Sequence, residues 1–268
     1  MTRTLTLLPL VLLAATPAWS SPADAPSVYV MALPANVALI AVVPRDKDLF
    51  DLDLRVEVVL PLGCGDRMAG LLRHGGASLD GPDDFDAVLE RRAAGECKKE
   101  PSRVAARWAI RMRLPDGATR DLTIGSRAFK VARAGAKVTL DGQPPEGDVP
   151  GAPPTAAPAT LVIGDVTEAK LTTAKALPGS AGTAVEVTLA ARWPKCAGPL
   201  LGLLGRGDAS SKFALDRFTP IALAPLDGSC GAAVAKPRPA TARAVVRVAQ
   251  FSVGAQRLAL PAATAAKK

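Results

Sequence analysis

The sequence predicts an all-β protein, built as two tandem β-sandwich or barrel-like domains that arose by internal duplication. Apolar and polar residues alternate with a period of two, which is typical of half-buried strands. Glycine and proline interrupt these runs at short intervals, as they do between the strands of sandwiches and barrels. A set of sequence matches also recurs, in the same order, in both halves of the chain. These three observations agree on the fold class.

Residues 1–20 have the pattern of an export signal. Arg3 precedes an apolar run from Leu5 to Ala15, which is too short to span a bilayer core of roughly 30 Å. Ala18-Trp19-Ser20 follows, and small side chains at positions −3 and −1 suit a signal peptidase. No later stretch is apolar for long enough to span a membrane. We therefore expect a protein exported to the periplasm or the extracellular space, without a transmembrane span.

The internal repeat is clearest around two cysteines, Cys64 and Cys196. From each of them the chain reads C-x5-G-L-L-x-x-G-x-A-S without a gap. Three further matches flank this motif, and they place β-domain 1 at 27–142 and β-domain 2 at 159–260. The matched segments are Val56–Leu60 with Val185–Leu189, Ala106–Arg111 with Ala242–Arg247, and Leu122–Ile124 with Leu258–Leu260.

The four cysteines are expected to form one disulfide in each copy, Cys64–Cys97 and Cys196–Cys230. An even number of cysteines in an exported chain indicates disulfides, and the repeat favours pairing within each copy. In the chain-entropy model, each bridge would contribute roughly 3–4 kcal/mol. Zinc is disfavoured because its sites use closely spaced cysteines, usually with histidine, and the chain has one histidine. No metal or other cofactor is predicted.

Several local structures can be assigned along the chain. A half-buried strand is expected over residues 103–114, and a hairpin is expected around Ala134-Gly135. Residues 82–92 allow a short helix capped by Asp83, although the aligned segment 212–224 contains Pro220 and favours an extended chain. Residues 143–158 contain six prolines and should form an extended linker, and residues 261–268 should form a flexible tail.

Arginines are spaced along one face of a predicted strand in each copy. A basic row in a chain of net charge +8 could bind an anionic envelope component or an acidic protein. Alternatively, Glu57 and Glu186 pair with the arginines across strands, where exposed pairs contribute roughly 0.2–1 kcal/mol. Nucleic acid is disfavoured because aromatic residues make up only 4% of the chain, too few for base stacking. The residues concerned are Arg107 and Arg111, and Arg243 and Arg247.

No catalytic residue is predicted. His74 is the only histidine, so a Ser-His-Asp or Cys-His site would need it, but no nucleophile motif surrounds it. The recurrent Gly-Leu-Leu segments are expected to pack leucines and to turn the chain. An acidic cluster lacks the spacing of a calcium-binding loop and is expected to be a solvated turn. Its members are Asp80, Asp83, Asp84 and Asp86.

The favoured function is therefore that of an exported, disulfide-stabilised, non-catalytic binding or structural protein of the cell envelope, which could engage an anionic partner. One alternative is an inhibitor or modulator of an extracellular hydrolase. It would present a disulfide-braced loop, either 91–96 or 224–229, at little ordering cost. A second alternative is an enzyme with an unrecognised site.

Overall fold

The computed structural model describes residues 28–60, 67–74, 82–91, 100–147, 159–177, 182–205, 217–225 and 236–261. These residues form seventeen strands and no helix, which confirms the predicted all-β class. The strands of the first half are β1 (Val28–Ala32), β2 (Pro34–Asp46), β3 (Leu49–Leu60), β4 (Arg67–Arg73), β5 (Asp84–Arg91), β6 (Ser102–Arg113), β7 (Thr119–Ile124), β8 (Arg127–Ala134) and β9 (Lys137–Leu140). Those of the second half are β10 (Ala159–Ile163), β11 (Asp165–Ala176), β12 (Thr183–Arg192), β13 (Leu200–Gly205), β14 (Arg217–Pro225), β15 (Arg238–Val246), β16 (Gln250–Val253) and β17 (Gln256–Ala259).

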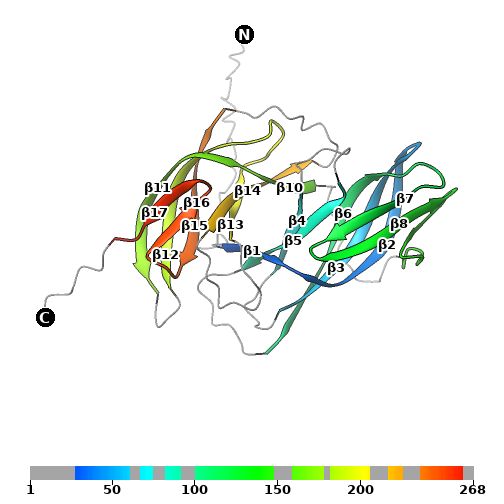
Figure 1. Ribbon diagram of the computed structural model, residues 1–268, viewed down its shortest axis with the longest axis horizontal. Coiled ribbons are helices and arrows are strands. Elements are labelled where there is room, and N and C mark those ends of the chain that lie inside the picture. The colour runs from blue at the N-terminus through cyan, green and yellow to red at the C-terminus, as the bar shows by residue number, and fades with distance from the viewer. Residues whose placement is uncertain are drawn as a thin grey trace, which may run out of the picture.

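Six strands at the centre of the molecule close into a ring. Successive hydrogen-bonded neighbours follow the order β1-β13-β14-β10-β4-β5, and β5 pairs with β1 again. Each half of the chain supplies three of these strands. β1 joins β5 of its own half to β13 of the other half, and β10 likewise joins β14 to β4. The two halves therefore share one sheet at the centre of the molecule (Figure 1).

Smaller sheets flank this six-stranded ring in two lobes (Figure 1). One lobe contains the antiparallel sheet β2-β3-β6, and the other contains β11-β12-β15. In addition, β7, β8 and β9 extend the central sheet from β5, and β16 and β17 extend it from β14. The hairpin expected around Ala134-Gly135 is the β8–β9 connection.

The pairing of the second half repeats that of the first half closely. β4 and β13 each carry a bulge at the same place relative to their partners, just before Gly70 and Gly202. β16 lies beside β14 as β7 lies beside β5, which places Ser252 and Val253 where Thr123 and Ile124 lie. The predicted match of Leu122–Ile124 with Leu258–Leu260 is therefore wrong, because Leu258 lies on β17, one strand further on.

Residues 84–91 form a strand, so the helix allowed over 82–92 does not occur. β5 hydrogen-bonds to β4 along one edge and to β1 and β7 along the other. A segment with partners on both edges forms its backbone hydrogen bonds within the sheet. Tertiary pairing thus overrides the local helical pattern.

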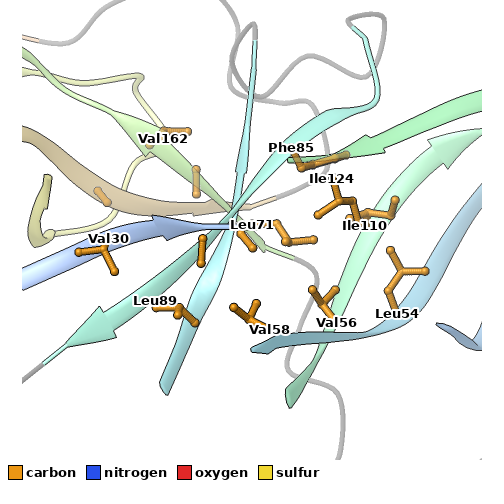
Figure 2. Close-up of a cluster of buried hydrophobic side chains, with 14 of the residues drawn as sticks. Val30, Leu54, Val56, Val58, Leu71, Phe85, Leu89, Ile110, Ile124 and Val162 are labelled. Carbon is orange, nitrogen blue, oxygen red and sulfur yellow. The ribbon is translucent and has the colours of Figure 1, made fainter. Parts of the chain in front are cut away.

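The described residues contain two apolar clusters. The larger one lies between the central strands and the flanking sheets, and Figure 2 shows part of it around Leu54, Val56, Leu71 and Phe85. The smaller one lines the ring and consists of Tyr29, Leu72, Val88, Leu161, Leu204 and Ile221. The Gly-Leu-Leu segments serve both clusters because neighbouring side chains of a strand point to opposite faces. Leu71 and Leu203 belong to the larger cluster, and Leu72 and Leu204 to the smaller.

Several predicted features lie outside the described residues. They are the export signal at 1–20, Cys64, Cys97 and Cys230, most of the linker at 143–158, and the end of the tail. Cys196 is described and packs, half-buried, against the larger cluster. Within the described part of the chain, no helix is long and apolar enough to cross a membrane.

Candidate ligand-binding site

The arginines of the first predicted row contact aspartates that the sequence analysis did not single out. Arg107 forms an ion pair with Asp53, and the Arg111 Nε donates a hydrogen bond of 2.6 Å to Asp51. Asp51 also accepts a hydrogen bond of 2.5 Å from Arg45. The alternation Asp51-Leu52-Asp53-Leu54 could have identified these aspartates as partners of the arginines. It places both aspartates on the polar face of β3, the same face of the sheet that carries the arginines of the neighbouring β6.

The pKa of Asp51 reflects two opposing influences. Burial acts to raise the pKa of this carboxyl, but the hydrogen bonds and charges of Arg111 and Arg45 outweigh burial. The pKa of Asp51 is therefore lower than usual, and the carboxylate is stabilised in its charged form. The ion pair between Asp51 and Arg111 therefore links the neighbouring strands β3 and β6 on their polar face.

The predicted pairing of the rows with glutamate is found in part. Arg243 lies opposite Glu186 on β12 and contacts it at 3.2 Å, as expected for a cross-strand pair. Glu57, however, contacts Arg103 at 2.9 Å rather than Arg107. Arg247 is exposed just beyond the end of β15.

The described aspartates of the acidic cluster at residues 80–86 do not share one set of contacts. Asp83 is buried and contacts Arg73 at 3.3 Å and Arg120 at 2.7 Å. Burial raises the pKa of Asp83, although both arginines act against this shift, and burial likewise lowers the pKa of Arg73. Asp86 instead contacts His74, and Asp80 lies outside the described residues.

A pocket of about 450 Å³ opens at one end of the six-stranded ring. Within each strand, alternate side chains point to the same face, so Asp86 follows Val88 along the inside of β5, and Thr219 follows Ile221 along the inside of β14. Leu72 and Leu204 of the smaller cluster form an apolar floor. Further lining residues include Met31, Arg73, His74, Asp86, Val162, Ile163, Pro194, Arg217, Phe218, Thr219, Ser252 and Gly254.

The polar groups of the pocket form two sets. On the side of β4 and β5, the His74 Nε2 and the Asp86 Oδ2 are 2.8 Å apart. On the side of β14 and β16, Arg217 and Ser252 are paired in register, and Thr219 lies two residues further along β14. The exposed Arg217 side chain has no ion pair or hydrogen bond with any described residue.

Toward its other end the ring contains a buried aromatic side chain, Tyr29. The Tyr29 ring packs directly on Gly202, and Tyr29 lies opposite Glu90, which forms an ion pair with Arg67. Burial, together with the charge of Glu90, raises the pKa of the Tyr29 hydroxyl, which therefore stays neutral. A ligand would accordingly enter at the end that carries Asp86 and Arg217.

Sequence reasoning found one part of this pocket and missed the rest. His74 and Asp86 were both singled out, but no local motif connects them with Arg217, Thr219 and Ser252. Pairing across the ring brings these distant segments together, and that pairing has no signal in a single segment. Comparison with family models, with curated proteins and with solved structures gives no match.

Proposed function

We propose that the protein is an exported, non-catalytic binding protein that holds a small organic anion in the pocket of the six-stranded ring. The observation that carries this proposal is the guanidinium of Arg217, which pairs with no described residue and belongs to a side chain that lines the pocket together with Thr219 and Ser252, above an apolar floor. Guanidinium groups bind carboxylates and phosphates through two parallel hydrogen bonds. Ligand pockets of roughly 300–1,000 Å³ combine an apolar lining with a few such polar groups.

We also propose that the protein is exported and stabilised by disulfides, as the sequence predicts. The mature chain would begin after residue 20, act in the cell envelope, and carry the bridges Cys64–Cys97 and Cys196–Cys230. The repeated pairing of the two halves supports an origin by duplication.

The pocket is preferred to the arginine rows as the contact for an anion. Arg107 and Arg111 are already paired with Asp53 and Asp51, so binding another anion there would compete with existing ion pairs. Arg243 pairs with Glu186 but is more exposed, and it is the better placed of the three for an acidic partner. The rows are therefore a secondary candidate.

Catalysis is a second candidate function because the His74–Asp86 contact resembles the orienting half of an acid–base site. A carboxylate that accepts a hydrogen bond from histidine fixes the ring and increases its basicity. Among the described residues, however, no hydroxyl or thiol is hydrogen-bonded to the His74 side chain. Binding is therefore the better-supported function.

The proposal is tested by removing the charge of Arg217. Calorimetric titration of the mature protein with medium-chain alkyl carboxylates and alkyl phosphates should show binding, and Arg217→Gln should weaken it about tenfold or more, because a charge-assisted hydrogen bond contributes about 1.5–3 kcal/mol. Arg113→Gln is the matched control, since it removes an exposed arginine that does not line the pocket. Equal affinities for the wild type and Arg217→Gln would contradict the proposal.

A further inference from the structure

The two halves of the protein carry different polar side chains at corresponding positions of β5 and β14, the strands that supply Asp86 and Arg217 to the pocket. Leu72 pairs with Asp86 as Leu204 pairs with Thr219, which makes Asp86 and Thr219 counterparts. Asp84 and Arg217 are also counterparts, because they pair with β7 and β16 in the same way. The first half therefore has carboxylates where the second half has a guanidinium and a hydroxyl, and Asp86, Arg217 and Thr219 line the pocket.

Asp86 and Arg217 lie on opposite sides of the pocket. Going round the ring, β5 and β14 are separated by two strands in either direction, β4 and β10 on one side and β1 and β13 on the other. Asp86 and Arg217 both line the pocket, so they approach a ligand from opposite walls. The pocket therefore has an acidic wall at Asp86 and a basic wall at Arg217.

The acidic wall can accept a further hydrogen bond. An ionised carboxylate has about four acceptor positions, and His74 contacts only the Oδ2 of Asp86. Arg73 also lines the pocket, but its guanidinium is directed to Asp83, Pro82 and the Arg111 carbonyl, and it stacks on Phe85 at 4.5 Å. The buried Arg73 is consequently committed to the protein and does not replace a cation at Asp86.

We propose that the ligand is a small zwitterion with an apolar body, such as an amino acid or a short peptide. Its carboxylate binds Arg217 with help from Thr219 and Ser252, and its ammonium group binds Asp86. The apolar body rests on Leu72 and Leu204. This inference rests on the proposed function and extends it, because an organic anion without a cationic group would leave Asp86 unused.

Capped forms of one compound separate the two charges. Calorimetry would compare leucyl-leucine with its N-acetyl form, its C-terminal amide and the doubly capped form, and then repeat the series with leucine. The free form should bind most tightly, and each cap should weaken binding about tenfold, equivalent to about 1.4 kcal/mol. Asp86→Asn should weaken the free form by a similar factor and leave the N-acetyl form unaffected.

The side-chain amide that Asp86→Asn introduces can still accept the hydrogen bond from His74, so the fold is expected to survive, and circular dichroism would check it. Asp121→Asn is the matched control because Asp121 is exposed on β7 and does not line the pocket. If the N-acetyl form binds as tightly as the free form while both amides bind more weakly, the zwitterion proposal is overturned and anion binding stands. If all four forms bind equally, both proposals fail. If no form binds, the zwitterion proposal is overturned, and the titrations with alkyl carboxylates and alkyl phosphates decide the proposed function.

Discussion

At the scale of single residues, two buried aspartates on the polar face of β3 form ion pairs with the arginines of β6. Asp51 and Asp53 are almost fully buried although they lie on the polar side of the strand. Paired arginines compensate for this burial, and removing one member of such a pair leaves an uncompensated charge. The arginine row is therefore a structural feature of the first half as much as a surface for partners.

Asp51→Asn should destabilise the protein in a pH-dependent way. At neutral pH, the loss of the charge-assisted hydrogen bonds from Arg111 and Arg45 should lower the free energy of unfolding by about 1.5–3 kcal/mol. The folded pKa of Asp51 lies below its unfolded value, so this stabilisation is complete above about pH 4 and is lost as the pH falls through the folded pKa. Urea unfolding at neutral and at acidic pH would measure the difference.

The control for this prediction is Asp121→Asn, which removes an exposed carboxylate from β7. It should change the free energy of unfolding little at either pH, because exposed charges are well solvated. A cost of Asp51→Asn that is equally large at both pH values would contradict the assignment. It would mean that the side chain acts through packing rather than through its charge.

The sequence could predict which face of a strand a residue lies on, but not which residue of another strand it contacts. The alternation of β6 correctly predicted that Arg107 and Arg111 share a polar face, opposite the face from which Trp108 packs against the larger apolar cluster. It did not identify Asp51 and Asp53 as their partners, because the choice between several acidic residues depends on the strand register. Register is a property of two segments, and neither segment contains it alone.

At the scale of the elements, the repeated Gly-Leu-Leu segments are sites of close packing. Gly202 lies against the Tyr29 ring, and Gly70 lies against Trp108 and Leu161. A side chain at either glycine would occupy space that these residues already fill. The sequence correctly suggested that the leucines pack, but the bulky partners come from other strands and carried no local signal.

Gly202→Ala should destabilise the protein because its Cβ would overlap the Tyr29 ring. Overpacking of this kind costs about 1–3 kcal/mol, which denaturant unfolding can measure. Gly198→Ala is the matched control, since its Cβ would meet only the Leu223 carbonyl oxygen, at 3.4 Å. Adding Tyr29→Leu should restore part of the loss, because Leu161 occupies the corresponding place on β10. No difference between the two alanine variants would contradict this interpretation.

At the scale of the whole molecule, the ring joins the two halves more closely than a tandem arrangement would. β1 and β10 each pair with a strand from the other half. Each of them also pairs with a strand of its own half, so it bridges the two halves. The repeated sequence motifs could not predict this bridging, because the second partner of each strand depends on the path of the whole chain.

The shared ring predicts that the halves stay together when the linker is cut. A protease site inserted between Gly151 and Pro158 should yield two fragments that co-elute on gel filtration and unfold in one transition, because β1 and β10 hold each half to the other. The predicted disulfides lie within the halves and would not join the fragments. The uncut protein with the same insertion is the control. Fragments that separate under native conditions, each with its own unfolding transition, would show that the halves are independent domains.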